Sequence, residues 1–348
     1  MNDRPDPASA PPPAPSAEAS SPWPWRPDAG GPAAAVLSAA LVPLALPYAW
    51  IAGRRLRAAR PPPPPLPTIG VGSPVAGGAG KTPTALALGR AARAMGLVPG
   101  FLTRGHGRSG RGPVMVDLDG QPAAETGDEP RLLAALGPTV TAVDRAAGAG
   151  LLAPSCDLIV MDDGFQSRRL AADPWLLVID GARGVGNGRV LPAGPLRAPL
   201  AAQFDAANAL VVVDSGGGTA GAAMVREMAG RRGIPVHSAR IEPVGDWRGR
   251  EVAAFCGLAD PGKFRRTLER AGARVARFRA FPDHHAFTAR DLREVAAMAG
   301  GLPLATTAKD AARLGPGAPA HEVLEIELSF DDGAAEALIA RAMRAFAR

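Results

Sequence analysis

The chain of 348 residues has room for about two domains, and a hydrophobic content of 47% suits a globular protein with a sizeable core. Its formal net charge of +6 is compatible with acidic partners such as phosphates or an anionic membrane surface, but no aromatic-interleaved basic stretch indicates nucleic-acid binding. Cys156 and Cys256 have neither metal-ligand nor redox spacing, so we expect two buried, reduced thiols in a cytosolic body.

The N-terminal region divides into a polar tail and an apolar segment. Residues 1–34 are mostly Pro, Ala, Ser and Asp, which predicts a disordered tail. Residues 33–53 carry no charge and approach the ~20 residues of a membrane-spanning helix, although Pro43 and Pro47 interrupt them. A spanning anchor, an interfacial helix and a buried soluble helix remain open, and we expect membrane contact over 35–60. The arginines that follow would hold this end on the cytoplasmic side: Arg54, Arg55, Arg57 and Arg60.

A glycine turn follows the first strand-like run and a stiff proline spacer over 61–65. The expected strand 68–71, the turn and an alanine-rich helix over 84–95 form the pattern that binds nucleotide phosphates. Glycines let backbone N–H groups close on phosphate oxygens, and the helix start adds partial positive charge. Lysine occurs only at 81, 263 and 309, which favours a functional loop over a plain turn. The usual spacing, however, needs a glycine where Val75 stands. The loop consists of Gly77, Gly78, Ala79, Gly80, Lys81, Thr82 and Pro83.

From residue 68 onward, apolar strand-like runs alternate with helical stretches, which predicts an α/β fold with a mostly parallel sheet. After Asp173-Pro174 the alternation of strands and helices begins again, which we take as a domain boundary. We place a P-loop nucleotide-binding domain over 61–172, a second, smaller α/β domain over 173–330, and a C-terminal helix over 331–348 that packs back on the body. Strands are expected at 68–71, 98–102, 114–116, 139–143, 157–161, 175–180, 209–213, 234–240, 252–256, 303–307 and 322–328. Further helices are expected at 129–136, 145–152, 221–232, 261–272, 288–299 and 333–347.

Two carboxylate pairs are candidates for the chemistry. Asp162 and Asp163 follow an apolar strand and would complete the Mg²⁺ shell begun by the Thr82 hydroxyl, although a doubled Asp at a strand end is also a common turn or cap. Asp128 and Glu129 precede a helix, as an N-cap with a helix-dipole partner would. Phosphoryl transfer to an alcohol also needs a carboxylate or histidine that accepts the hydroxyl proton.

Arginines and histidines supply the remaining candidates. Arg104 and Arg108 follow a strand and either face the phosphates or belong to a solvated basic loop. Asp283, His284 and His285 contain the paired histidine of the chain, and an Asp–His couple for proton transfer fits better than a zinc site. The loop 181–199 is too rich in Gly and Pro for regular structure, and three polar residues favour a functional loop: Asn187, Arg189 and Arg197.

Taken together, these motifs resemble the tetraacyldisaccharide 4′-kinases of lipid A biosynthesis. In the family's order they are GGAGKTP, TRGHGR, GDEP, DDGFQ, GNGRVLPAGPLR, FCGLADPGKF, FPDHHAF and TTAKDAARL. The family also lacks the first glycine of the phosphate loop, which accounts for Val75. The sequence departs from the family's pattern at Ser73-Pro74 (usually Asn-Leu), His106 (usually Tyr) and Ser167 (usually His).

The resemblance implies an ATP- and Mg²⁺-dependent kinase that phosphorylates the 4′-hydroxyl of a tetraacylated glucosamine disaccharide 1-phosphate. It implies two α/β/α domains with a cleft between them, and an N-terminal helix that meets the cytoplasmic face of the inner membrane of a Gram-negative bacterium. We expect a monomer. By matching motifs, Asp128 would be the catalytic base with His284 paired to it and Asp283 orienting them, and Glu129, Asp162 and Asp163 would serve the Mg²⁺ shell. Lys81 and Thr82 keep their phosphate and metal roles, and the arginines and Asn187 fall in matching motifs.

Two other classes are weighed against the lipid kinase. A membrane-associated P-loop NTPase switch would carry a second lysine before the two glycines, where this chain has Ala76, or an Asn-Lys-x-Asp element for GTP, which is missing. A soluble kinase of a small sugar or nucleoside would not require the uncharged segment 33–53.

Overall fold

The computed structural model describes residues 32–58, 60–105, 112–118, 120–121, 127–258, 260–283, 285–315 and 317–348. Most of the expected tail lies outside these ranges, and residues 32–34 belong to helix α1 (Pro32–Ala40). The two cysteines are free and buried, as expected for reduced thiols.

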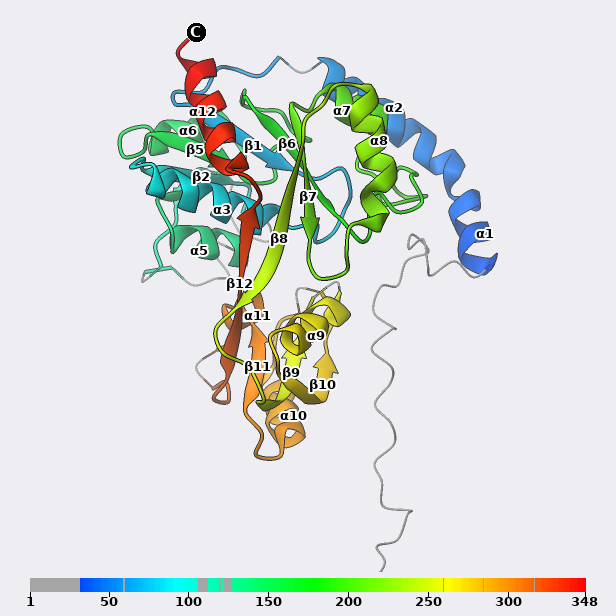
Figure 1. The fold of residues 1–348 in the computed structure, drawn as a ribbon, viewed down its shortest axis with the longest axis vertical. Coiled ribbons are helices and arrows are strands. Elements are labelled where there is room, and N and C mark those ends of the chain that lie inside the picture. The colour runs from blue at the N-terminus through cyan, green and yellow to red at the C-terminus, as the bar shows by residue number, and fades with distance from the viewer. Residues whose placement is uncertain are drawn as a thin grey trace, which may run out of the picture.

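A large, mostly parallel sheet is the frame of the molecule, which confirms the predicted α/β class (Figure 1). Within the described residues its twelve strands follow the order β10-β9-β11-β12-β8-β7-β6-β1-β5-β2-β4-β3. Only the pairs β8–β12 and β3–β4 are antiparallel. The strands are β1 (Thr68–Gly72), β2 (Pro99–Thr103), β3 (Val114–Met115), β4 (Thr139–Thr141), β5 (Leu158–Met161), β6 (Trp175–Asp180), β7 (Ala209–Asp214), β8 (Val236–Val244), β9 (Glu251–Cys256), β10 (Arg274–Ala280), β11 (Leu304–Thr307) and β12 (Glu322–Phe330).

Helices cover this sheet and extend from it at the N-terminus (Figure 1). After α1 they are α2 (Val42–Ala58), α3 (Lys81–Ala94), α5 (Asp128–Ala134), α6 (Arg145–Leu152), α7 (Leu200–Asp205), α8 (Ala223–Arg231), α9 (Pro261–Arg270), α10 (Ala289–Ala299), α11 (Ala308–Ala311) and α12 (Ala334–Phe346). The C-terminal helix α12 packs against α3 and β1.

The central strand β1 is packed too tightly for side chains at its two glycines. All five of its residues are buried. A Cβ at Gly70 would lie 2.1 Å from the ring of Trp175, and one at Gly72 would lie 2.3 Å from Phe165. These two aromatic rings meet edge to face at 5.6 Å. The glycines therefore let Phe165 and Trp175 close over β1 directly before the phosphate loop.

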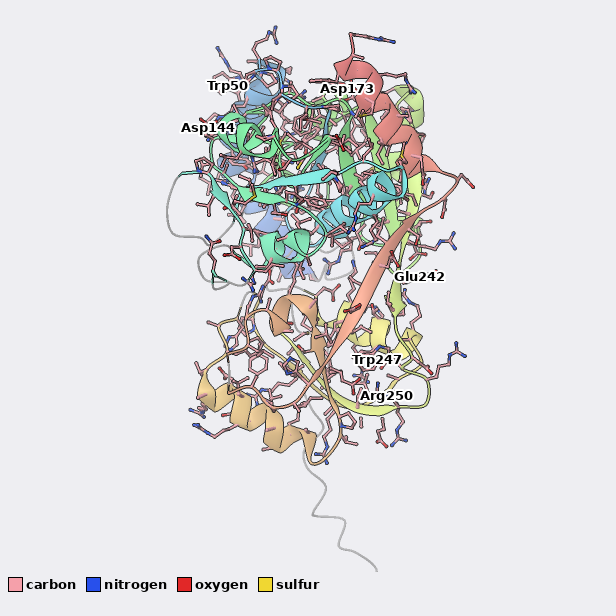
Figure 2. All side chains as sticks on the ribbon, turned by 90° about the vertical axis from the view of Figure 1, so that its left-hand side faces the viewer. Trp50, Asp144, Asp173, Glu242, Trp247 and Arg250 are labelled. Carbon is pink, nitrogen blue, oxygen red and sulfur yellow. The ribbon has the colours of Figure 1, made fainter. Side chains whose placement is uncertain are left out.

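The chain forms a larger and a smaller half, joined by two long strands. β8 and β12 have nine residues each and run antiparallel from the larger half into the smaller one, which contains β9, β10, β11, α9 and α10 (Figure 1). In Figure 2, Glu242 of β8 lies between the halves, and Trp247 lies in the smaller half. Both β5 and β6 pair with β1, so the expected domain boundary near residue 173 falls within one continuous sheet of the larger half.

Several elements differ from the expectation. β10 was not predicted because the arginines of its sequence RVARFRA do not keep the strict alternation of a half-buried strand, and its pairing with β9 has a register irregularity between Val275 and Arg277. The short helices α7 and α11 were not predicted either. In the N-terminal segment the chain bends by 56° between α1 and α2, whereas Pro47 lies inside α2. Within the described residues no single helix is long and apolar enough to cross a membrane, although α1 and α2 pass that test as a bent pair.

Candidate phosphoryl-transfer site

The predicted phosphate loop connects β1 to the N-terminus of α3. Gly77 and Gly80 have φ values of 105° and 94°, which a residue with a Cβ rarely adopts. Gly80 is the N-cap of α3 and caps it with no side-chain hydrogen bond. The first backbone N–H groups of α3 are therefore available to an anion, together with the positive end of the helix dipole.

Val75 replaces the usual first glycine because this position has ordinary extended pairing. It forms an isolated antiparallel bridge with Leu196, and the flanking hydrogen bonds join Ala76 N–H to Pro195 O and Arg197 N–H to Pro74 O, at 2.8 and 2.9 Å. Side-chain amides support the same segment: Gln166 donates to Ser73 O, and Gln203 donates to Pro74 O. No positive φ is needed there, so a β-branched residue fits.

Thr82 and Asp162 meet beneath the loop. The Thr82 hydroxyl donates to Oδ2 of Asp162 at 3.0 Å, and both side chains are buried. Burial, together with the nearby charges of Glu129 and Asp163, raises the pKa of Asp162 to about 6, while Lys81 and the Thr82 hydroxyl act in the opposite direction. The expected partnership of these two residues is thus present in the geometry.

Asp163 connects the loop lysine to an arginine of the 181–199 loop. Its Oδ1 lies 3.8 Å from Lys81 Nζ and accepts a hydrogen bond of 2.8 Å from Arg197 Nη1. Asp163 has a φ of 53°, an unusual conformation that turns its carboxylate back toward the loop directly after β5. Arg197 also donates to Oε1 of Gln166 at 3.3 Å. The arginine lies at the phosphate site, on the side where the loop 181–199 meets it.

Arg145 is a buried cation near the aspartate pair that we did not predict. It is 2% exposed at the start of α6, and its charge acts on Asp162 and Asp163. Burial lowers its pKa to about 10, and the two aspartates offset part of that effect. Within the described residues its Nη1 has no hydrogen-bond partner. A cation in the first turn of a helix opposes the helix dipole, and that conflict was the signal available in the sequence.

The two carboxylates at the start of α5 are partly described. Asp128 begins the helix, and its side chain lies outside the described part of the structure. Oε1 of Glu129 accepts a hydrogen bond of 2.5 Å from Nζ of Lys309, which belongs to α11 in the smaller half. The role of Lys309 was also not predicted, although its rarity as a lysine was a signal. Of the arginines after β2, Arg104 is exposed and Arg108 lies outside the described residues.

The paired histidines divide between a described and an undescribed residue. His284 lies outside the described residues, so its expected approach to Asp128 stays a prediction, and Asp283 is exposed. His285 stacks on Phe281 at 4.8 Å and lies 3.0 Å from Oδ2 of Asp291 through its Nε2. The Asp–His couple that the structure describes is therefore His285–Asp291, at the N-terminus of α10.

Asn187 and Arg189 contact the N-terminal helix. Both donate to the hydroxyl of Ser38 in α1, at 3.1 and 2.9 Å. Ser38 is 3% exposed and donates to Ala193 O at 2.6 Å. The polar residues of the 181–199 loop thus hold α1 against the body at one end and reach the phosphate site through Arg197 at the other.

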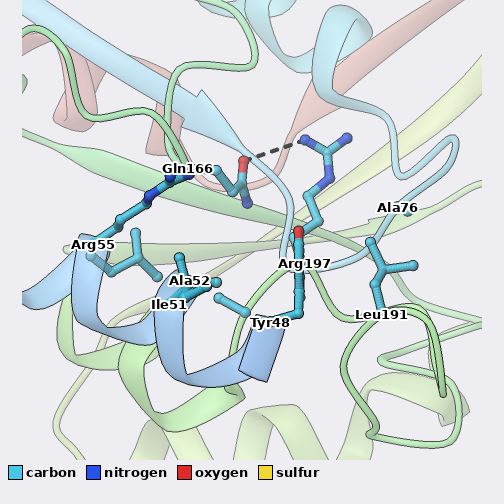
Figure 3. A pocket seen from close by; sticks show the side chains of 10 residues that line it. Tyr48, Ile51, Ala52, Arg55, Ala76, Gln166, Leu191 and Arg197 are labelled. Carbon is cyan, nitrogen blue, oxygen red and sulfur yellow. Dashed lines mark hydrogen bonds between the residues drawn. The ribbon is translucent and has the colours of Figure 1, made fainter. Parts of the chain in front are cut away.

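A pocket of about 370 Å³ lies between α2 and the phosphate site (Figure 3). One wall is apolar and comes mostly from α2, and the opposite wall carries Gln166 and the site residue Arg197. Figure 3 shows these two side chains joined by their hydrogen bond, with Arg55 of α2 on the near side. The lining residues are Tyr48, Ile51, Ala52, Arg55, Leu56, Ala76, Gln166, Leu191, Arg197 and Ala198.

The donor groups fit a magnesium ion that shares its shell with a nucleotide. Mg²⁺ commonly takes one or two carboxylates and completes its octahedron with phosphates and waters. Thr82, Asp162 and Asp163 supply such a set, and Oδ1 of Asp162 is a buried acceptor with no partner among the described residues. Among the residues that the structure describes, no group of three or more His, Cys, Asp or Glu residues could hold a metal ion without further ligands. The protein groups therefore offer part of a magnesium shell.

A parallel sheet that carries a glycine turn, Lys-Thr and an aspartate pair defines a nucleotide-binding α/β protein. The comparisons with known proteins identify which kind. The model of the LpxK family, tetraacyldisaccharide-1-P 4′-kinase, matches residues 37–344. A tetraacyldisaccharide 4′-kinase from Allorhizobium ampelinum is 47% identical over 318 residues, which cover 86% of this chain and 91% of that protein. One from Methylorubrum populi is 50% identical over 277 residues, which cover 78% and 84%.

A solved structure supports the same conclusion. The crystal structure of LpxK from Aquifex aeolicus in complex with ATP superposes with a TM-score of 0.68 at 27% identity, covering 88% of this chain and 99% of that one. The chain belongs to the tetraacyldisaccharide 4′-kinase family, and it is an ATP-dependent kinase.

Proposed function

We propose that this protein transfers the γ-phosphate of ATP to the 4′-hydroxyl of a tetraacylated glucosamine disaccharide 1-phosphate, a precursor of lipid A. The observation that carries the proposal is the position of Arg197. It bonds Asp163 at the phosphate site and at the same time lines the pocket under α2. An amphipathic acceptor whose apolar part lies along α2 would therefore present a hydroxyl next to the nucleotide.

The residues of the loop would hold the triphosphate. The N–H groups of Gly78, Gly80 and the start of α3 would bind the phosphate oxygens, and Lys81 would neutralise charge on the β- and γ-phosphates. Two further cations lie near the aspartate pair: Arg145 interacts with Asp162 and Asp163, and Arg197 bonds Asp163. Thr82, Asp162 and Asp163 would hold a magnesium ion, with Glu129 serving its water shell. When bound, the ion supplies additional neutralisation of the developing phosphate charge.

Asp128 and His284 are proposed to handle the proton. The 4′-hydroxyl oxygen forms a bond to the γ-phosphorus, the bond from that phosphorus to the β–γ bridging oxygen breaks, and ADP leaves. Asp128, at the start of α5, accepts the hydroxyl proton, and Asp283 orients His284 toward it. Asp128→Ala should then reduce turnover far more than ATP binding, and an equal loss of both would make Asp128 a structural residue or a metal ligand.

We further propose that α1 and α2 seat the protein on the cytoplasmic face of the inner membrane. The two helices bury Ser38, Ala45 and Leu56 against the body and expose apolar side chains on their other face. Arginines follow at the end of α2, where they suit anionic headgroups. In this arrangement Asn187 and Arg189 keep the helices over the pocket, so that the acceptor can enter from the bilayer. The exposed apolar side chains outside the pocket are Val36, Leu37, Leu44, Leu46 and Trp50, and two more exposed apolar residues, Tyr48 and Ile51, line the pocket.

The test is transfer of ³²P from ATP to the disaccharide lipid, with Arg197→Ala compared with wild type. We expect labelled lipid from wild type and at least a tenfold lower kcat/KM for the lipid in the variant. Arg231→Ala serves as a control because Arg231 is an exposed arginine of α8 whose ion pair, with Glu227, lies within that helix. ATP hydrolysis without labelled lipid would instead support a nucleotide switch.

A further inference from the structure

The three lysines of the chain share an unusual environment. Among 39 basic residues only Lys81, Lys263 and Lys309 are lysines, so 36 are arginines (39 − 3 = 36). Each lysine forms an ion pair with a carboxylate of the larger half: Lys81 with Asp163, Lys263 with Asp180, and Lys309 with Glu129. Lys263 and Lys309 belong to the smaller half, so their two ion pairs connect the halves.

The two connecting pairs differ in how firmly they are built. Asp180 is 5% exposed, and its carboxylate also accepts hydrogen bonds from Ser215 and from the N–H groups of residues 182 and 183. A second ion pair, Arg183–Asp260, lies beside it. At the other contact, the side chains of Lys309 and Glu129 are 32% and 34% exposed. The carboxylate of the Lys263–Asp180 pair is therefore buried, whereas both side chains of the Lys309–Glu129 pair are partly exposed to solvent.

Lys309 is held in place by the element that carries it. α11 begins after β11 with Thr307 as its N-cap. Asp310, the residue that follows Lys309, is fully buried. The Asp310 carboxylate accepts from Thr307, from the N–H of Gly257 and from Arg313. α11 packs against α5, and Figure 1 places it at the end of the smaller half that faces α5. The Lys309 ammonium is thus presented to the start of α5 by a fixed backbone.

Glu129 in turn belongs with the carboxylates of the phosphate site, because α5 packs against α3, the helix that begins with Lys81 and Thr82. Among the nearby charges, that of Glu129 has the largest effect in raising the pKa of Asp162. The partly exposed pair with Lys309 is worth at most about 1 kcal/mol of stability, so stabilising the fold does not explain it. Holding the Glu129 carboxylate at the start of α5, where its charge acts on Asp162, and balancing that charge would explain it.

We propose that Lys309 is a positioning residue: through Glu129 it fixes the carboxylate group of the phosphate site and joins the docking of the smaller half to binding of the divalent cation. The part that concerns the cation rests on the proposed magnesium site, and the docking of the halves is independent of it.

Two measurements separate these parts. Spin labels at Met224→Cys in α8 and Arg290→Cys in α10, both exposed, report the distance between the halves in the protein without nucleotide. The native cysteines are buried and stay unlabelled under native conditions. The Mg²⁺ concentration at half-maximal ATP binding, measured calorimetrically, reports the cation site. The variants are Lys309→Ala, Lys309→Arg, Glu129→Gln and the Ala/Gln double variant, each checked by thermal unfolding.

Lys309→Ala is expected to broaden the distance distribution and to raise the half-saturating Mg²⁺ concentration about tenfold. Lys309→Arg should restore the narrow distribution, and the double variant should be no worse than Glu129→Gln alone, because both remove one interaction. Arg250→Ala is the matched control, since its ion pair with Glu322 lies on the surface away from α5 and should leave both readouts unchanged. Unchanged distances in Lys309→Ala, or effects that add in the double variant, would overturn the proposal. Altered distances with an unchanged Mg²⁺ requirement would overturn the coupling of Lys309 to the cation and leave it a role in docking alone.

Discussion

At the scale of single residues, the phosphate loop departs from the usual motif without a defect. Val75 is extended and bridges to Leu196, so the loop 181–199 supports the backbone that a glycine would otherwise bend. The two positions that need left-handed backbone, Gly77 and Gly80, are both glycines. The family's missing glycine is therefore explained by a neighbouring loop.

Restoring the usual motif with Val75→Gly should weaken the protein. Glycine has more conformational freedom than valine in the unfolded chain, and the substitution removes the packing of the valine side chain. The free energy of unfolding should therefore fall by about 1–2 kcal/mol. ATP affinity, measured calorimetrically, should not improve. Gly78→Ala is the matched control for stability, because a Cβ there meets no atom within 4 Å. Tighter ATP binding by Val75→Gly at unchanged stability would contradict this account.

The raised pKa of Asp162 predicts a pH effect with a definite sign. Because the folded-state value of about 6 exceeds the ordinary 3.8, the folded protein binds the extra proton between these values. Its free energy of unfolding therefore falls, through this group, as the pH rises from about 4 to about 6. Asp162→Asn removes the effect, so its stability relative to wild type should increase over this range, by on the order of 2 kcal/mol, and stay constant above it. Urea denaturation of the nucleotide-free proteins measures the difference, and a pH-independent difference would indicate an ordinary pKa.

At the scale of elements, α1 and α2 have two different faces. One face packs on the loop 181–199 and α7, through Ser38 and Gly53, and the other exposes large apolar side chains. Leu46 and Trp50 are each 63% exposed, and Arg54 lies over the Trp50 ring at 5.4 Å. This arrangement suits a helix that lies along a bilayer surface.

The double variant Leu46→Ser/Trp50→Ser should lose membrane affinity and keep its fold. Each side chain contributes about 1.5–3 kcal/mol when buried in an apolar phase, so partition onto anionic vesicles should fall at least about tenfold. Stability should change by less than about 0.5 kcal/mol per site, because both side chains are exposed. The control is Met224→Ser/Ile326→Ser, two apolar residues of similar exposure elsewhere on the surface. Equal loss of vesicle binding in both double variants would argue against a dedicated membrane face.

At the scale of the whole molecule, two strands and three ion pairs hold the halves together; the pairs are Lys263–Asp180, Arg183–Asp260 and Lys309–Glu129. β8 and β12 are continuous through both halves, and the Lys263–Asp180 pair lies at their junction. Burial alone would raise the pKa of Asp180, but the Lys263 ammonium, its hydrogen bond and the N–H of Arg183 more than offset this and lower it. The contribution of Asp180 to stability is therefore present above about pH 4 and is lost as the pH falls through its folded-state pKa.

Lys263→Ala should accordingly destabilise the protein by about 3 kcal/mol near neutral pH, because it leaves Asp180 buried without its cation. The difference from wild type should shrink in acid, where Asp180 is protonated. Arg265→Ala, two residues further along α9, removes an exposed pair with Glu269 and should cost at most about 0.5 kcal/mol. Chemical denaturation across the pH range measures both variants. Similar losses in the two would show that the Lys263 pair behaves as a surface pair.

The sequence by itself determined the local structure around the phosphate loop. Strand 175–180 and helix 145–152 have the predicted bounds, and the phosphate loop lies between a strand and a helix as expected. These predictions succeeded because periodicity, glycines and caps act over a few residues. The partnership of Thr82 with Asp162 was also predictable, because strand ends of a parallel sheet meet at one edge.

Only the tertiary structure decided which distant residues meet. Lys309 and Glu129 are 180 positions apart, and Ser38 and Arg189 are 151 apart, so no local pattern relates them. Burial of Arg145 beside two aspartates likewise depends on packing of α6 against the sheet. Contacts of this kind follow from chain topology and side-chain packing across the whole fold, whereas motif spacing reports only on neighbours along the chain.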